Sequence, residues 1–410
     1  RDYGENWEEI SDGFADEAWV HVVREDPRTP GLLYAGTETG IYVSFNGGEL
    51  WQSLQLNLPN TPINDLIVHE RENDLVVATS GRSFWILDDL SPLQQAARDV
   101  PDGDEHGHHL YSPRHAYRLA GGSGFGGGGE GVNGPSGAVI DFMLGEVPDG
   151  ESVAVTIRTP AGDVIRTLST QPDQEVSPGS STLLVHTGHN RIVWNLRHEN
   201  IPNIPGAYVF GSLQGRRVIP GDYVVELSVG HWRMEEVLTV RKDPRVETTL
   251  QEYVEQDQFV AQVATELSAI HRTVSRNNDV REQIETFLER AGDEVGTGPV
   301  AEEGENLAQE LENVADSLYQ RRVVDGQTVI NFPSRLKFQY VFLHGNADGA
   351  ETGVSMGSRE VFSDLRARWT VHRATSDELL GPRLDAFNRM IQEAGFSIII
   401  APPRLRRPVS

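Results

Sequence analysis

The sequence predicts a multidomain chain that is mainly β in its first part and mainly α in its last part. Three observations support this prediction. A turn motif recurs near the start, apolar and polar residues alternate through the middle, and apolar residues repeat at helical spacing toward the end. With 410 residues, 38% of them hydrophobic, the chain is long enough for about two to four domains with cores of their own.

The turn motif is clearest where four residues fit the pattern Ser-x-Asn-x-Gly-x-x-Trp, namely Ser44, Asn46, Gly48 and Trp51. An asparagine side chain can accept hydrogen bonds from the backbone N–H groups of a tight turn. Glycine allows a positive φ, and tryptophan can anchor the outgoing strand. These residue types at this spacing therefore predict a structural hairpin.

An earlier copy of the motif opens the chain, since Asp2, Gly4 and Trp7 each lie 44 residues before their counterparts. A repeat of this length is typical of four-stranded propeller blades, so residues 1–92 are predicted to be two terminal blades of a partial β-propeller. Trp7–Ile10 is expected to be an outer strand. The next blade has four expected strands and the last blade three, at 19–23, 32–37, 40–45, 51–54, 63–69, 75–79 and 84–87. We expect further blades upstream in a longer parent protein, and a strand from elsewhere to complete the last blade.

The motif resembles the Asp-box of sialidase-like and sortilin-like (VPS10-like) β-propellers, which is a structural hairpin and not an active site. Residues 81–89 look like the terminal blade of the large exported bacterial proteins labelled sortilin-like or BNR-repeat "glycosyl hydrolases". Residues 110–118 are similar to the strand that follows the propeller in that group. The resemblance extends over essentially the whole chain and implies a secreted protein, extracellular or periplasmic.

The middle of the chain is predicted to be a β-sandwich at 135–243, preceded at 93–134 by a linker with one strand and a glycine-rich stretch. The run that ends in Trp194 and the Pro-Gly-Asp turn before Tyr223 resemble the FlgD-type immunoglobulin-like domain. That resemblance implies that Trp194 lies in the core and that Tyr223 anchors a strand.

Residues 244–398 are predicted to form an antiparallel helical bundle, followed by a tail at 399–410. Thr249 and Glu252 fit a capping box, and Gly395 fits the position after the last helix. Apolar residues repeat in four helical stripes, which we interpret as bundle core, with a groove for a partner as the alternative. The stripes are Val263, Leu267, Ile270 and Val274; Leu307, Leu311, Val314 and Leu318; Phe362, Leu365 and Trp369; and Leu380, Leu384, Phe387 and Ile391.

The composition excludes several classes of function. A formal net charge of −26 makes nucleic acid and anionic membrane surfaces poor partners, because both need a basic face. The absence of cysteine excludes disulfides and thiolate ligands. No apolar run reaches about 18 residues, so no membrane span is predicted. The sequence carries no nucleophile elbow, His-Glu-x-x-His or dinucleotide fingerprint, so we predict no catalytic residue and no cofactor.

Glu38, Asp65 and Arg82 are predicted to lie on one face of the propeller, around its channel. Loops on a rigid scaffold often carry function, so these residues are candidates for binding a ligand such as a glycan. Glycoside hydrolysis would need two carboxylates about 5–10 Å apart, one of them with a raised pKa. A solvated rim, with Arg82 bonding loop carbonyls, is the alternative.

A histidine-rich loop offers weak metal-binding candidates, His106, His108 and His109. It lacks the helical His-x-x-x-His spacing, and a polar linker between domains is the alternative. Four tryptophans are interpreted as core residues and not as a sugar-stacking set, namely Trp7, Trp51, Trp85 and Trp194.

The function predicted from these patterns is that of a non-catalytic C-terminal region of an exported β-propeller protein. The sandwich and the bundle are expected to brace the upstream blades and to support binding of a polysaccharide, a peptide or another exported protein. One alternative is a glycoside hydrolase whose active site lies in the propeller channel, mostly outside this chain. Another is a purely structural subunit of a surface assembly.

Overall fold

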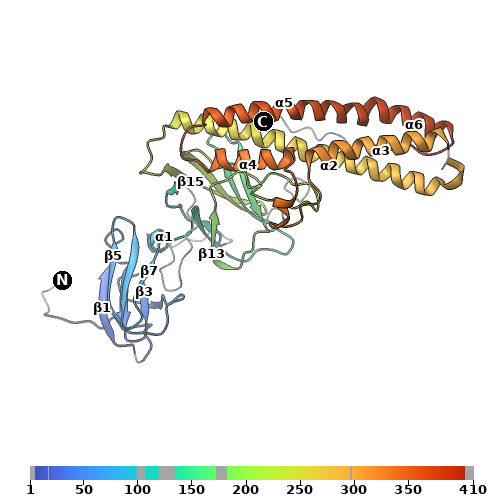
Figure 1. Ribbon diagram of the computed structural model, residues 1–410. Coiled ribbons are helices and arrows are strands. Elements are labelled where there is room, and N and C mark those ends of the chain that lie inside the picture. Colours follow the sequence, from blue (N-terminus) through green and yellow to red (C-terminus); the bar gives the residue numbers. More distant parts are fainter. Residues whose placement is uncertain are drawn as a thin grey trace.

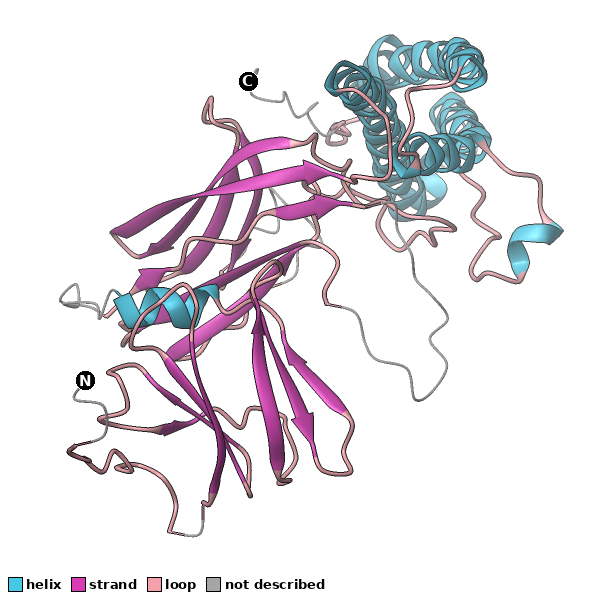
Figure 2. Cartoon of the chain, turned by 90° about the vertical axis from the view of Figure 1, so that its left-hand side faces the viewer, coloured by secondary structure: helices cyan, strands magenta, loops and turns pink. Residues whose placement is uncertain are grey.

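The computed structural model describes residues 5–16, 18–98, 107–119, 134–171, 182–295 and 298–401. Figure 1 shows two sheets near the N-terminus, two further sheets in the middle and long helices in the last part. In Figure 2 those helices are seen nearly end-on beside the sheets. The predicted order, a β part followed by an α part, is confirmed.

The two N-terminal sheets are antiparallel meanders, in which each strand pairs with the next along the chain. Sheet A consists of β1 (Val20–Glu25), β2 (Leu33–Thr37), β3 (Ile41–Ser44) and β4 (Gln52–Ser53). Sheet B consists of β5 (Ile63–His69), β6 (Asp74–Thr79) and β7 (Phe84–Leu87). After β7 the chain enters α1 (Ser91–Arg98), and no fourth strand pairs with sheet B among the described residues.

The first strands of sheets A and B share an irregularity. The pairing register shifts between Val20 and Val22 in β1, and between Ile63 and Asp65 in β5. A bulge of this kind raises the local twist and redirects the side chains around it. The first strands of the two sheets therefore share this feature at the same place.

The second strands of the two sheets also end alike, each in a threonine that closes the following turn. The N–H of Thr37 donates to the Gly40 carbonyl at 2.8 Å, and the N–H of Thr79 donates to the Ser83 carbonyl at 3.3 Å. Each threonine hydroxyl donates to the same carbonyl, at 3.0 and 2.6 Å. Sheet B therefore resembles the first three strands of sheet A, and none of the described strands takes the place of β4 beside β7.

Sheets A and B pack face to face around one core, to which sheet A contributes Tyr34 and sheet B contributes Leu66 and Val77. The sheets approach closely at Gly36, where a Cβ atom would lie 2.6 Å from Cγ2 of Ile63. Only glycine leaves room for that contact, so this position depends on the absence of a side chain.

The turn after β3 has the predicted chemistry. The N–H of Gly48 donates to the Ser44 hydroxyl at 2.9 Å, and the N–H of Leu50 donates to Oδ1 of Asn46 at 3.0 Å. Gly48 has a φ of 96°, in the region that favours glycine. Trp51 is buried at the start of the outgoing strand, as expected of an anchor.

The earlier copy of the motif does not fold as predicted. Asp2 and Gly4 lie outside the described residues, and Trp7 is 91% exposed. Residues 7–10 form no strand, so the prediction of an outer strand with a core tryptophan is wrong. Trp51 Nε1 instead donates to the Ile10 carbonyl at 2.8 Å, and the Phe14 ring stacks on Trp51. Residues 10–14 therefore cover Trp51 without forming a strand. The Trp7 ring has no described strand to pack against.

The middle of the chain forms two more sheets that enclose a second core. Sheet C consists, in order, of β13 (Gly188–Trp194), β10 (Ala138–Leu144) and β8 (His109–Leu110). Sheet D consists of β12 (Val164–Ser169), β11 (Val153–Arg158), β14 (Gly221–Val229), β15 (Trp232–Lys242) and β9 (Ala116–Arg118). The Trp194 ring packs edge-on against Tyr223 in this core, and the Tyr223 hydroxyl donates to the Ile219 carbonyl at 2.7 Å. The roles predicted for Trp194 and Tyr223 are confirmed.

The segment predicted as a linker with one strand contains two short strands, one in each middle sheet. β8 pairs with β10 in sheet C, and β9 runs parallel to β15 in sheet D. Runs of two or three residues carry too little alternation to be recognised as strands in a sequence. The glycine-rich stretch of this segment, from 120 to 133, lies outside the described residues.

The last part of the chain is helical. Its elements are α2 (Leu250–Val295), α3 (Pro299–Leu318), a short 3-10 turn η1 (Thr328–Asn331), α4 (Leu336–Gly349), α5 (Met356–Glu378), a π-helical turn η2 (Leu379–Arg383) and α6 (Leu384–Glu393). Every residue of the four predicted apolar stripes is buried in one core, which confirms the prediction of bundle core. At 46 residues, α2 is about 70 Å long and supports the other helices along its length.

Both predicted ends of the helical part are confirmed. The N–H of Thr249 donates to Glu252 Oε2 at 2.8 Å, and the N–H of Glu252 donates back to the Thr249 hydroxyl at 3.3 Å. Gly395 has a φ of 87°, and the N–H of Phe396 donates to the Ile391 carbonyl at 2.9 Å. Reciprocal capping at the start and a left-handed glycine at the end satisfy backbone groups that a helix otherwise leaves unpaired.

The middle sheets are joined to the helices by a buried polar network. Ile201 and Ile204, between β13 and β14, are part of the helical core. Close by, Arg197 Nη1 lies 2.6 Å from Asp348 Oδ2, and the backbone N–H of Arg217 donates to Asp348 Oδ1 at 2.8 Å. A buried carboxylate is stable only when it is paired in this way, so the network fixes how α4 sits on the sheets.

Candidate functional site

The carboxylates predicted to line a ligand site lie near strand β1, each beside a basic group. Glu38, in the loop between β2 and β3, has Oε2 2.6 Å from Nε2 of His21. Asp65, in β5, accepts a hydrogen bond from Arg24 at 2.9 Å. Side-chain exposures of 51% for Glu38 and 63% for Asp65 leave both carboxylates largely in solvent. Glu38 and Asp65 therefore lie on a solvated surface, each with a basic side chain as its neighbour.

Arg82 is exposed in the loop between β6 and β7, where its carbonyl accepts a hydrogen bond from Trp85 Nε1 at 2.9 Å. In the described part of the chain, no hydrogen bond or ion pair joins Glu38, Asp65 and Arg82. The three residues are not assembled into one constellation here, and their role in ligand binding stays a prediction.

The histidine-rich loop shows packing roles where it is described. His106 lies outside the described residues. His108 is buried, its Nδ1 accepts a hydrogen bond from the Gly145 N–H at 3.1 Å, and its ring packs against Trp232. The His109 ring packs edge-on against Tyr111. Over the described ranges, no three His, Asp or Glu side chains converge in a geometry that would hold a metal ion.

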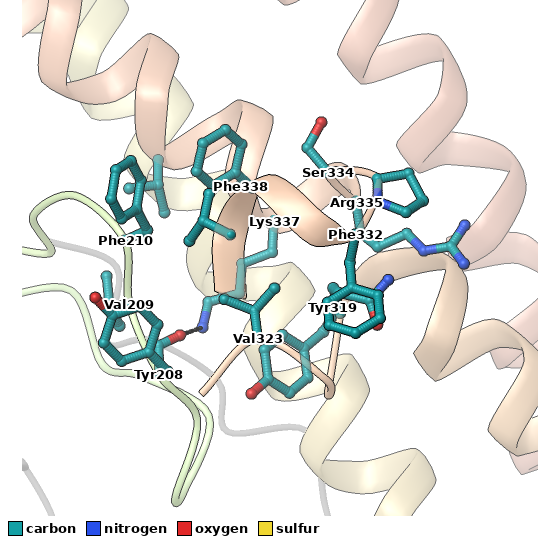
Figure 3. Close-up of a pocket in the computed structure, with 14 residues that line it drawn as sticks. Tyr208, Val209, Phe210, Tyr319, Val323, Phe332, Ser334, Arg335, Lys337 and Phe338 are labelled. Atoms are coloured by element: carbon teal, nitrogen blue, oxygen red, sulfur yellow. Dashed lines mark hydrogen bonds between the residues drawn. The ribbon is translucent and has the colours of Figure 1, made fainter. Parts of the chain in front are cut away.

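A cleft in the helical part has the features of a binding site. Figure 3 shows it between the segment that carries Tyr208, the end of α3 and the start of α4. The walls are mostly apolar, and five aromatic residues contribute to them, Tyr208, Phe210, Tyr319, Phe332 and Phe338. Binding sites for small molecules are commonly apolar clefts with a few convergent polar groups.

The polar group of this cleft is Lys337, which is only 4% exposed. Its Nζ donates to Asn203 Oδ1 at 3.0 Å and to the Tyr208 carbonyl at 3.4 Å, and it lies 4.7 Å from the centroid of the Tyr319 ring. All of these partners are neutral. Burial lowers the pKa of Lys337 from its ordinary value of 10.5 to about 8, because the ammonium form loses its hydration.

Two arginines border the same cleft, and neither has a carboxylate partner in the described ranges. Arg335 lines the cleft, and its Nε is buried without a described hydrogen-bond partner. Arg322 holds its guanidinium over the Phe332 ring, 5.7 Å from the centroid. In a chain with a net charge of −26, this is a locally positive site.

The cleft could not be predicted from the sequence, because its walls come from segments more than 100 residues apart. One signal was available. Lys337 is one of only two lysines in the chain, and it stands among aromatic residues on an otherwise ordinary helical pattern. A rare lysine at a position that the helix buries is a candidate for function, since lysine is almost never fully buried without a partner.

No family model matches this chain, and no curated protein matches it. Among the described helices, none combines the length and the apolar character that crossing a membrane requires.

Proposed function

We propose that this chain is a non-catalytic region of an exported β-propeller protein that supports binding of a polysaccharide, a peptide or another exported protein. In this proposal sheets A and B are two terminal blades, and sheets C and D form an immunoglobulin-like sandwich that braces them together with the helices. The observation that carries the proposal is the resemblance of sheet B to the first three strands of sheet A.

The free edge of sheet B supports this reading. A groove between sheets A and B reaches β7. It is lined by Trp85 and Leu87 on that strand, by Leu75 and Val77 on β6, and by Leu56 and Leu58 in the loop after β4. In sheet A, the corresponding place beside β3 is filled by β4. An apolar groove next to an unpaired strand edge is suited to receive an extended segment as an added strand.

The outer face of sheet B is also apolar. Ile67, Phe84 and Ile86 are 62%, 74% and 60% exposed, and pairing through β6 places them on the same face. Monomeric proteins rarely expose apolar side chains together on one face of a sheet. A neighbouring blade would cover these side chains, just as sheet B covers the inner face of sheet A.

The surroundings of Glu38 and Asp65 favour binding over hydrolysis. A glycosidase needs one carboxylate that stays protonated, which requires burial or a like charge nearby. Here each carboxylate is exposed and has His21 or Arg24 beside it, and neither lies in the buried surroundings that such an acid needs. Exposed, balanced charges of this kind suit a rim that contacts a polar ligand.

The proposal predicts binding without turnover. A screen of polysaccharides and peptides against the complete natural protein, with hydrolysis assayed in parallel, is expected to give at least one ligand and no hydrolysis. The double variant Glu38→Gln with Asp65→Asn, which keeps the shape and removes both charges, is expected to weaken that binding by less than about tenfold, since exposed charges contribute little. If the wild-type protein hydrolyses a polysaccharide and the double variant does not, the glycoside hydrolase alternative would replace the proposal.

A further inference from the structure

We propose that the cleft around Lys337 binds a hydrophobic carboxylate, whose acid group pairs with the Lys337 ammonium and whose apolar body lies against the aromatic walls. This site belongs to the helical part and is independent of the propeller proposal. Either proposal can fail without the other.

The first argument is the missing counter-charge. Lys337 is buried beside an amide oxygen, a carbonyl oxygen and an aromatic ring, and no described carboxylate lies within ion-pair distance of its Nζ. The neighbouring region is different, since Arg321 lies 2.7 Å from Glu312 and 2.6 Å from Asp316. Carboxylates are abundant in this chain, yet the described residues place none beside this buried ammonium, so its chemistry is suited to pairing with an anion.

The second argument is the direction of the amine. Figure 3 shows the Lys337 side chain reaching from α4 toward Tyr208 and Val323, on the inner side of the cleft. The Arg335 guanidinium is turned the other way, so it adds positive potential near the cleft and makes no direct contact with an acid at Lys337. The position for the acid group is therefore next to Lys337 alone.

The third argument is the shape and chemistry of the walls. The Phe210 and Phe338 rings are stacked, with centroids 5.8 Å apart and planes inclined by 23°, and Phe342 continues the stack at 6.4 Å. Phe342 is 61% exposed, so the row of rings leads from the cleft to the surface. The space of about 490 Å³ at the cleft includes the open solvent at its mouth, so an acid the size of an acylated amino acid would lie partly in the cleft and partly along the exposed rings.

Two sources could provide this chemistry, a free hydrophobic acid or the C-terminal residue of a peptide. Both present a carboxylate next to an apolar side chain. Sugars and nucleotides fit less well, because the walls offer them few polar groups.

The test compares N-acetyl-L-phenylalanine with its neutral amide, N-acetyl-L-phenylalaninamide, by isothermal titration calorimetry on the complete chain near neutral pH. The acid is expected to bind at least about tenfold more tightly than the amide, because only the acid neutralises the buried ammonium. Lys337→Met, which keeps the volume and removes the charge, is expected to abolish that preference. The matched control is Lys242→Met at the other lysine, which is exposed at the end of β15 and is expected to leave the preference unchanged.

A second variant keeps the test decisive if Lys337→Met alters the fold. Val323→Phe narrows the cleft without changing the charge of Lys337. It is expected to weaken binding of N-acetyl-L-phenylalanine by about tenfold or more. Equal affinity for acid and amide in the wild-type chain, no binding of either, or a preference that survives Lys337→Met would overturn the proposal.

The source of the ligand is decided by a peptide ending in phenylalanine, with a free or an amidated C-terminus. Tighter binding of the free-acid peptide than of N-acetyl-L-phenylalanine would assign the site to a peptide C-terminus. The reverse order would assign it to a small acid.

Discussion

Replacing Glu351 by alanine is expected to lower the free energy of unfolding by about 3–5 kcal/mol, because it leaves the buried Arg118 without a described carboxylate partner and leaves Arg217 only the longer ion pair with Asp348, at 3.7 Å. Glu351 forms ion pairs with Arg217 and with Arg118, and it also accepts a hydrogen bond from the Tyr253 hydroxyl at 2.8 Å. The side chains of Glu351 and of both arginines are at most 7% exposed. Water therefore cannot replace the lost carboxylate without opening the junction between sheet D and the helices.

Urea unfolding followed by circular dichroism measures this loss. The matched control is Glu255→Ala, since Glu255 forms an exposed ion pair with Arg359, at 3.6 Å and with both side chains about half exposed. The Glu255→Ala control is expected to lower the free energy of unfolding by less than about 1 kcal/mol. If Glu351→Ala costs no more than Glu255→Ala, the buried network does not hold the junction together.

Replacing Lys337 by methionine is expected to raise the free energy of unfolding by about 1–2 kcal/mol near neutral pH. Burial lowers the pKa of Lys337 to about 8 from 10.5, and each unit corresponds to about 1.4 kcal/mol, from which the lost hydrogen bonds to Asn203 and Tyr208 are subtracted. Methionine has a similar volume and needs no hydration, so it suits the aromatic surroundings.

The effect of this substitution has a defined pH dependence. Between pH 8 and 10.5 the unfolded chain still binds the lysine proton while the folded chain has released it, so the stability of the wild-type chain rises with pH across that window. The advantage of Lys337→Met is therefore complete below pH 8 and fades toward 10.5. Urea unfolding midpoints of wild type and Lys337→Met, compared at both ends of this pH window, measure this advantage. Lys242→Met is the control. A variant that is less stable than wild type below pH 8 would show that the lysine is there for the fold.

This prediction bears on the ligand site. A substitution that stabilises the fold and removes binding is the usual signature of a residue kept for function.

The strands of sheets A and B and the helical stripes could be predicted because they depend on local patterns. Alternation over β5 and the spacing of Val263 and Leu267 each reflect one face of one element against one core. The hairpin of Asn46 was predictable for the same reason, since its hydrogen bonds join residues four apart.

The features that could not be predicted depend on contacts between distant segments. Trp7 fits the motif, but a tryptophan is buried only where a neighbouring element covers it. The Phe14 ring stacks on Trp51, whereas Trp7 stays exposed. The basic partners of Glu38 and Asp65 lie on β1, and the approach of Arg24 to Asp65 depends on the packing of sheet A against sheet B. The cleft of Lys337 needs the fold of three separate segments.

The claim on which the proposed function depends is that β7 receives a further strand in the complete protein. Amide hydrogen exchange of residues 84–87, measured on the complete natural protein, tests it most directly. The outward-facing amides of β7 are expected to be as well protected as those of β6, which is paired on both sides. Rapid exchange at those amides, beside protected amides in β6, would leave β7 as a free edge and contradict the account.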